Sequence, residues 1–181
     1  MNDGRLWIFG YGSLMWEPGF AHDHAEIAVL RGFARTFCMR SIHHRGTPDA
    51  PGLVLALDRE PRSQCEGLAI RVSAGHEDET MAYLRERELI SSAYLETTQV
   101  VEVASGGQVE AVAFIVDDAH VQYCGGLPLE EQAGIISRAH GGRGANSEYL
   151  LNTCIHLDQL GLHDPDLVWL SSRVRDILGH G

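Results

Sequence analysis

Apolar residues recur along the first two thirds of the chain in short runs, several of which alternate with polar residues at a period of two. This period is typical of a strand that buries one of its faces. The pattern predicts seven strands, at residues 6–9, 27–30, 36–40, 53–57, 67–72, 95–103 and 110–116.

Apolar positions three and four residues apart indicate helices at residues 76–89, 129–139, 146–160 and 165–178. One helix interrupts the strand series and three follow it, unlike the regular alternation of a doubly wound sheet. The order favours an α+β fold with a mixed sheet or a small barrel. Since neither an internal repeat nor a long linker appears, we expect a single domain over residues 1–181.

Composition narrows the classes of partner. Hydrophobic residues make up 44% and charged residues 22% of the chain, as in an ordinary globular protein, and the formal net charge is −11. This charge repels nucleic acids and anionic membrane surfaces, so we expect neither as a partner. A small anionic substrate stays open, but its pocket would need arginines of its own.

Cysteine usage and the N-terminal residues indicate the compartment. Cys38, Cys65, Cys124 and Cys154 lie far apart and form no CxxC pair. The stretch around Asp3 and Arg5 has no apolar run of signal or membrane length. We therefore expect reduced thiols in a cytoplasmic protein.

The stretch GYGSLMW, residues 10–16, directly follows the first strand. It lacks the third glycine of GxGxxG, the GK[ST] of a phosphate loop and the spacing of a GxSxG nucleophile elbow, so Ser13 is not expected to be a nucleophile. Gly10 and Gly12 permit close approach of a ligand to backbone N–H groups, which can form an anion cradle. A plain turn is the alternative.

Glu88 is the strongest candidate for acid–base chemistry. Met81, Leu84 and Glu88 share one face of the predicted helix, which is its apolar face, whereas Arg85, Glu86 and Arg87 are predicted to point progressively into solvent. A carboxylate on an apolar face has a raised pKa, which suits proton exchange near neutral pH. The alternative is a helix-end glutamate in water or paired with an arginine.

Two glycine-rich stretches offer candidate cations. In HHRGTP, residues 43–48, a predicted loop presents Arg45, which is either a bidentate partner for a substrate carboxylate or a surface ion pair. In GGRGANSEYL, residues 141–150, Asn146 is predicted to cap a helix whose N-terminus, with Arg143, forms a candidate anion site. His22 with His24 could chelate a metal from one strand face, but no HExxH motif or Cys/His quartet supports a site, so no metal is expected.

Together these stretches resemble the gamma-glutamylcyclotransferase family, specifically its glutathione-specific ChaC-like branch. WIFGYGSLMWEPGF, HRGTP with PGLVLAL, AYLRERE and GRGANSEYL occur in the order of the family's blocks and cover residues 6–160. The resemblance implies a compact mixed β-barrel with flanking α-helices, no cofactor and no metal. It places the catalytic glutamate at Glu88.

The same resemblance implies a substrate loop whose backbone holds the gamma-glutamyl group, at Tyr11, Gly12, Ser13 and Leu14, and places Tyr123 near the site. It implies cleavage of glutathione to 5-oxoproline and cysteinylglycine. Residues 89–93 replace a glycine-rich step found in many relatives, so other gamma-glutamyl compounds remain alternative substrates. A non-catalytic gamma-glutamyl-binding protein is the further alternative, and it would be expected to lack the buried glutamate.

Overall fold

The computed structural model describes residues 4–89 and 91–179. Asp3 of the N-terminal stretch and Ile90 of the segment after Glu88 lie outside these residues. Within them the chain forms two compact units, one of residues 4–35 and 57–120 and the other of residues 36–56 and 121–179. The single domain expected over residues 1–181 stays a prediction.

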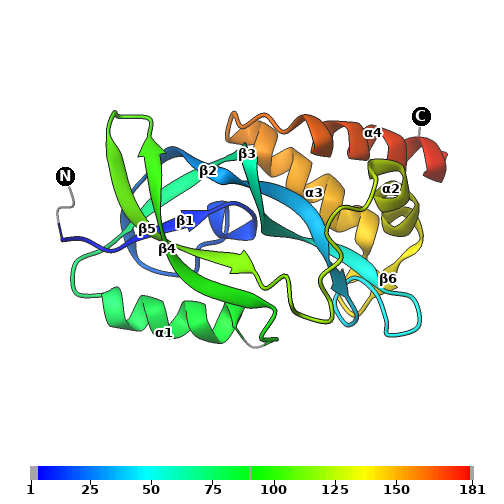
Figure 1. Ribbon diagram of the computed structural model, residues 1–181, viewed down its shortest axis with the longest axis horizontal. Coiled ribbons are helices and arrows are strands. Elements are labelled where there is room, and N and C mark those ends of the chain that lie inside the picture. Colours follow the sequence, from blue (N-terminus) through cyan, green and yellow to red (C-terminus); the bar gives the residue numbers. More distant parts are fainter. Residues whose placement is uncertain (1–3, 90, 180–181) are drawn as a thin grey trace. The chain divides into compact units, whose positions relative to one another are not determined.

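Five strands close into a barrel in the order β1, β3, β2, β4, β5. Strand β5 pairs with β1 in parallel, while β1 with β3, β2 with β4, and β4 with β5 are antiparallel, so the barrel is mixed, as predicted. Figure 1 shows the strands, which are β1 (Trp7–Gly10), β2 (His22–Ser41), β3 (Gly52–Val72), β4 (Tyr94–Val103) and β5 (Gln108–Val116).

The predictions of two strands at 27–30 and 36–40, and of two more at 53–57 and 67–72, were wrong in number. Each pair forms one long strand, β2 or β3. Gly32 adopts a φ of +82° within β2, a conformation open to glycine, so the chain turns there without leaving the strand. Pro61 lies in an exposed part of β3, where its missing N–H is tolerated.

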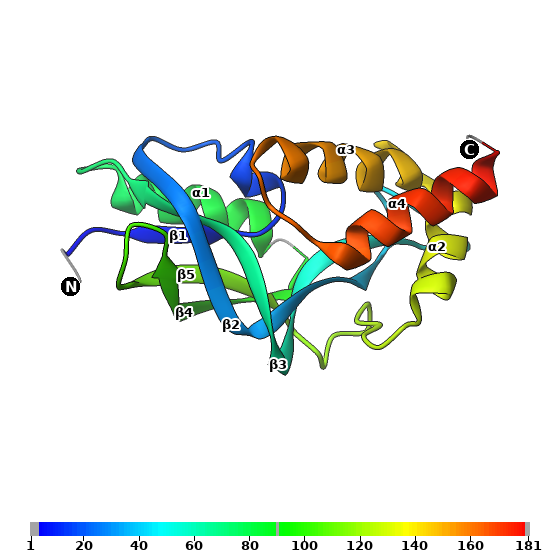
Figure 2. The same cartoon turned by 90° about the horizontal axis from the view of Figure 1, so that it is seen from above.

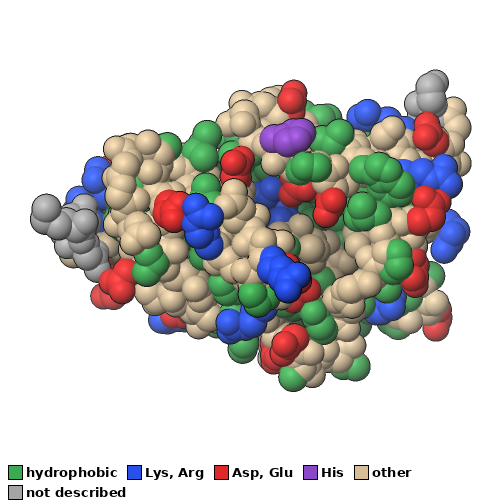
Figure 3. All heavy atoms as spheres, turned by 45° about the horizontal axis from the view of Figure 1, so that its top comes forward, with side chains coloured by type: hydrophobic (Ala, Val, Ile, Leu, Met, Phe, Trp, Pro, Cys, Tyr) green, Lys and Arg blue, Asp and Glu red, His purple; other side chains and the backbone are tan. Residues whose placement is uncertain are grey.

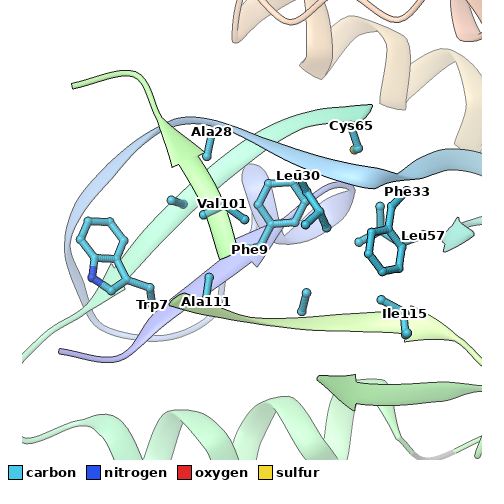
Figure 4. Close-up of a cluster of buried hydrophobic side chains, with 12 residues drawn as sticks. Trp7, Phe9, Ala28, Leu30, Phe33, Leu57, Cys65, Val101, Ala111 and Ile115 are labelled. Atoms are coloured by element: carbon cyan, nitrogen blue, oxygen red, sulfur yellow. The ribbon is translucent and has the colours of Figure 1, made fainter. Parts of the chain in front are cut away.

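Successive side chains of β1 alternate between two clusters, as the period of two predicts. Trp7 and Phe9 of β1 point into a core that Figure 4 shows in close-up, whereas Ile8 between them joins a second cluster with the helix α1. Both faces of β1 are therefore buried. The core cluster consists of Trp7, Phe9, Ala28, Leu30, Phe33, Leu57, Cys65, Ala69, Val101, Ala111, Ala113 and Ile115.

Helix α1 (Glu77–Glu88) covers this second face of β1. Leu84 is fully buried and packs in one cluster with Ile8 and Phe114, and Met81 packs against the same cluster. The predicted helix at 76–89 and its apolar face are thus confirmed.

Helices α2 (Leu129–Arg138), α3 (Asn146–Gln159) and α4 (Pro165–Leu178) belong to the other unit and pack on one another, as Figure 2 shows. Their ends agree with the predicted ranges within one residue. Asp164 caps α4 by accepting a hydrogen bond from the Leu167 N–H (3.1 Å). Two short strands before α3, β6 (His140–Gly141) and β7 (Gly144–Ala145), were not predicted, because two-residue strands carry no periodicity.

The described helices lack the combination of length and apolar sequence that a membrane-spanning helix needs. On the face shown in Figure 3, acidic and basic side chains are interspersed.

Candidate active site

The stretch GYGSLMW leaves the barrel at the end of β1 and forms a short 3₁₀ helix, η1 (Ser13–Met15). Its first hydrogen bond runs from the Met15 N–H to the Gly12 carbonyl (2.9 Å), so the N–H groups of Ser13 and Leu14 precede the helical bonds. A Cβ atom on Gly12 would meet no atom within 4 Å. The backbone is therefore open on the Gly12 side, as the amide-cradle hypothesis requires.

An apolar residue of the loop itself attaches the loop to the protein core. Leu14 is 6% exposed and packs in the cluster that contains Ile8 and Leu84, so it joins the loop to β1 and to α1. The apolar residues that follow Ser13 therefore anchor the turn in the core.

Glu88 is the last residue of α1, and its side chain is only 19% exposed. Burial raises the pKa of its carboxyl above the ordinary value, and the neighbouring Arg87 guanidinium offsets part of that rise. The C-terminal end of a helix also disfavours negative charge. The side chain is therefore placed as the helical period predicted, in surroundings that favour proton uptake.

Arg87 does not point into solvent, which corrects the prediction for this side chain. Its Nη2 donates to Ser13 Oγ (2.8 Å) and its Nη1 donates to the Glu17 carbonyl (2.8 Å) and to Tyr83 Oη (3.0 Å). Its Nε lies 3.3 Å from Glu88 Oε1. One guanidinium thus joins the candidate acid–base residue to the candidate substrate loop.

A second buried arginine holds the loop at Tyr11. The Nε atom of Arg35, which is 7% exposed, donates to the Tyr11 carbonyl (2.7 Å), and its Nη2 donates to the Glu66 carbonyl. We did not predict this role. The predicted strands at 27–30 and 36–40 left Arg35 between them. In the continuous strand β2 the period of two places Arg35 on the same face as the buried Phe33.

A pocket of about 420 Å³ lies along the N-terminal half of α1. Its lining reaches Tyr83, whose hydroxyl also accepts the hydrogen bond from Arg87. The pocket is lined by Gly19, Phe20, Ala21, His76, Glu79, Thr80 and Tyr83.

In the other unit, Arg45 lies against the start of α3. Its Nη1 donates to the Ala145 carbonyl (3.1 Å) and lies 3.8 Å from Glu148 Oε2, and its guanidinium carbon lies 5.6 Å from the centre of the Tyr149 ring. The side chain is 17% exposed. Arg45 therefore has structural contacts of its own, in addition to any role toward a ligand.

Asn146 does not cap α3, contrary to the prediction. It is the first residue of the helix, is fully buried, and binds the backbone of Leu53: its Oδ1 accepts from the Leu53 N–H and its Nδ2 donates to the Leu53 carbonyl, both at 2.8 Å. This two-bond pairing satisfies both polar groups of a buried strand residue, which a capping side chain could not do.

Three glycines explain why the chain can approach itself so closely beside Arg45. A Cβ atom on Gly46 would lie 2.1 Å from the Gly52 N atom, one on Gly52 would lie 2.2 Å from the Arg45 carbonyl oxygen, and one on Gly141 would lie 2.5 Å from the Gly46 N atom. Arg143 sits in the same junction, with its N–H donating to the His44 carbonyl (2.9 Å) and its side chain exposed.

Tyr123 is half-buried and pairs with Met39 through an isolated antiparallel bridge. The predicted site residues thus form two groups. Tyr11–Leu14 and Glu88 are linked through Arg87, and Arg45 and Arg143 are linked through the glycine junction.

A comparison with sequence models of protein families matches residues 6–177 to the family described as ChaC-like protein. The chain belongs to the ChaC-like family. The match extends over every helix and strand described above, from β1 into α4.

Curated relatives of this ChaC-like chain agree with that assignment. It is 34% identical over 177 residues to the "Glutathione-specific gamma-glutamylcyclotransferase" of Escherichia coli K12, covering 98% of this chain and 76% of the relative. It is 35% identical over 180 residues to the "Gamma-glutamylcyclotransferase 2-3" of Arabidopsis thaliana, covering 96% and 90% of the two chains.

The ChaC-like fold also matches a solved structure. The crystal structure of a gamma-glutamyl cyclotransferase specific to glutathione from yeast superposes with a TM-score of 0.82 at 23% identity, over 94% of this chain and 96% of that one. This likeness confirms the fold.

Among the residues that the structure describes in this ChaC-like chain, no group of three or more His, Cys, Asp or Glu side chains is arranged to hold a metal ion. The expected absence of a metal and of a cofactor stays a prediction.

Proposed function

We propose that this protein is a glutathione-specific gamma-glutamylcyclotransferase, which cleaves glutathione to 5-oxoproline and cysteinylglycine. The observation that carries the proposal is the joining of the mostly buried Glu88 to the loop residue Ser13 by one guanidinium, that of Arg87. Its relatives support the substrate class, since the Escherichia coli protein bears that activity in its name.

The reaction proposed is an intramolecular attack. The α-amine of the glutamyl residue attacks its own γ-carbonyl carbon, a C–N bond closes the five-membered lactam, and the bond to the cysteinyl nitrogen breaks. No protein nucleophile is required. A pocket that holds the glutamyl chain in a folded conformation lowers the activation barrier by several kcal/mol, because it keeps the amine close to the γ-carbonyl carbon.

Glu88 serves first as base and then as acid. The substrate amine is mostly an ammonium at neutral pH, since its ordinary pKa is about 8, so its proton must be removed before attack. The Glu88 carboxylate takes this proton and then returns it to the departing cysteinyl amine. The raised pKa of Glu88 suits the second step, because a carboxyl of ordinary pKa holds its proton too weakly at neutral pH.

Tyr11, Gly12, Ser13 and Leu14 are proposed to bind the gamma-glutamyl group through the backbone. The N–H groups of Ser13 and Leu14 are suitable donors for the oxyanion of the tetrahedral intermediate, and one such donor is typically worth about 10² to 10³ in rate. Ser13 Oγ acts through Arg87, so the hydroxyl holds the loop and takes no part in covalent chemistry.

Arg45, Arg143 and Tyr123 are proposed as further substrate-binding residues. Glutathione carries two carboxylates and the protein a formal net charge of −11, so local arginines are needed to offset the repulsion. Arg143 offers an exposed guanidinium for this purpose, whereas Arg45 is partly occupied by the Ala145 carbonyl and the Tyr149 ring.

We also propose that the protein acts in the cytoplasm, without nucleic-acid or membrane partners. The acidic composition and the spacing of the cysteines support this proposal.

The test is incubation of the purified protein with glutathione, followed by detection of 5-oxoproline and cysteinylglycine by mass spectrometry. Equimolar release of both supports the proposal, and release of neither from folded protein contradicts it. A panel of gamma-glutamyl amino acids and gamma-glutamyl amines then measures specificity. Faster turnover of any of these than of glutathione would reassign the substrate.

A further inference from the structure

Two cysteines far apart in the sequence lie opposite each other in the structure. Met39 of β2 pairs with Tyr123 in an antiparallel bridge, so the residues on either side, Cys38 and Cys124, face each other in the same register. The Cys124 N–H donates to the Cys38 carbonyl (2.8 Å), which fixes this pairing.

The segment that carries Cys124 is held against β2 by further hydrogen bonds. The Arg40 N–H donates to the Gln122 carbonyl (2.9 Å), and the Gln122 side-chain Nε2 donates to the Arg40 carbonyl (3.0 Å). The register is therefore fixed from both sides of the bridge, and the two cysteine side chains lie on the same face of the ladder.

Facing positions of this kind lie within reach of a disulfide. The bond from the Cys124 N–H to the Cys38 carbonyl makes this a hydrogen-bonded position of the ladder. Facing Cα atoms at such a position are about 5.5 Å apart, within the range of about 4.4 to 6.8 Å that disulfides join. Facing Cβ atoms at a hydrogen-bonded position lie toward the wide end of the range of about 4.5 to 5.5 Å, whereas the mean in a disulfide is about 3.8 Å. A bond therefore needs a small inward movement of one segment and no change of register.

The two thiols differ in access. Cys38 is 1% exposed, whereas Cys124 is half-buried and so is the more accessible residue of the two. Both are thiols in the structure, as are Cys65 and Cys154. A partly accessible thiol beside a buried one is the arrangement in which the first reacts with an oxidant and the second resolves the product.

We propose that Cys38 and Cys124 form a reversible dithiol–disulfide site that reacts with low-molecular-weight disulfides. The Cys124 thiolate attacks one sulfur of the reagent, and the first reagent thiol leaves. The Cys38 thiolate then attacks Cys124 Sγ, which closes the protein disulfide and releases the second reagent thiol. The two protein thiols lose two electrons and two protons, and the reagent disulfide gains them.

The site is tested with the full chain in buffers of hydroxyethyl disulfide and 2-mercaptoethanol, neither of which is a gamma-glutamyl compound, so the test is independent of the proposed function. Remaining thiols are alkylated and the protein is digested with trypsin. Cleavage after arginine places the four cysteines on separate peptides, at residues 36–40, 63–71, 88–138 and 144–173. The expected product is peptide 36–40 linked to peptide 88–138, lighter by two hydrogens.

Matched variants identify the pair. Cys124→Ser and Cys38→Ala should abolish the linked peptide, while Cys65→Ser and Cys154→Ser should leave it unchanged. The oxidised wild-type protein should unfold several degrees higher than the reduced form, since the bond closes a long loop between residues 38 and 124. Dithiothreitol should reverse both changes.

Three results would overturn the proposal. They are a linked peptide that appears only when the protein is oxidised in denaturant, a lower unfolding temperature on oxidation, and accumulation of a stable mixed disulfide on Cys124 in wild-type protein. The Cys124→Ser variant keeps the test decisive if the buried Cys38→Ala variant fails to fold.

Discussion

Glu88 carries a charge that its surroundings disfavour. Its side chain is mostly buried at the C-terminal end of α1, and burial raises the pKa of its carboxyl. Water stabilises the charge of a glutamate on the surface, whereas burial makes the Glu88 carboxylate easier to protonate. Burial of this single residue therefore lowers the stability of the folded protein and, in return, suits the carboxyl to proton transfer.

The substitution Glu88→Gln should reduce 5-oxoproline release by at least about 10², because an amide cannot take the proton of the substrate amine. Glutathione binding, measured by calorimetry, should be retained. Glu86→Gln, at an exposed position on the same helix, is the control and should keep full activity. More than a tenth of wild-type turnover in Glu88→Gln would contradict the assignment.

The same variant should be more stable than the wild type at neutral pH. Because the folded state holds the Glu88 proton more tightly than the unfolded chain, stability falls as pH rises from the ordinary pKa to the raised one. Glu88→Gln removes that dependence. Thermal unfolding should show its advantage at pH 7 shrinking toward the ordinary glutamate pKa of about 4.3, and a constant or reversed difference would contradict the burial argument.

Arg87 should control both the pKa of Glu88 and the position of the substrate loop. Removing its charge in Arg87→Met should raise the pKa of Glu88 further and move the acid limb of the kcat/KM profile to higher pH. Arg87→Lys keeps the charge and should shift that limb less, although it loses the bonds to Ser13 and Tyr83.

Arg85→Met is the control for Arg87, since Arg85 is exposed and pairs with Glu96 on the protein surface. Its pH profile should match the wild type. A loss of activity in Arg87→Met without any shift of the acid limb would show that Arg87 acts only on the loop.

At the scale of elements, helix ends were predicted well and strand lengths less well. The helical period predicted α4 at its observed bounds, Pro165–Leu178, because a proline start and a following Gly179 with φ of +77° mark both ends locally. Gly32 and Pro61 also look like local ends, but β2 and β3 continue past them. Whether a strand continues past such a residue depends on hydrogen bonding to its neighbouring strands. The sequence of one strand does not show which strands are its neighbours.

The contact between α3 and β3 should depend on Asn146. Asn146→Ala leaves the buried N–H and carbonyl of Leu53 without their side-chain partners and should cost about 2 to 4 kcal/mol of unfolding free energy. Asn152→Ala, at an exposed position of the same helix, should change stability by less than about 0.5 kcal/mol. Urea denaturation measures both, and equal effects would contradict the role given to the pair.

At the scale of the whole molecule, β2 and β3 each contribute residues to both compact units. If residues 1–181 fold as one domain, scanning calorimetry should show a single transition whose calorimetric and van't Hoff enthalpies agree. Two resolved transitions would show instead that the units unfold separately.

The sequence by itself determined the class of fold, the four helices and the side of α1 on which Glu88 lies, because periods of two and 3.6 residues record burial directly. The order of its sequence motifs also indicated the family. Only the tertiary structure decided which groups meet. Arg87 binds Ser13 across 74 positions and Asn146 binds Leu53 across 93, while Cys38 faces Cys124. Periodicity shows that a side chain is buried, but its partner depends on strand pairing and chain closure, which bring together residues that are distant in the sequence.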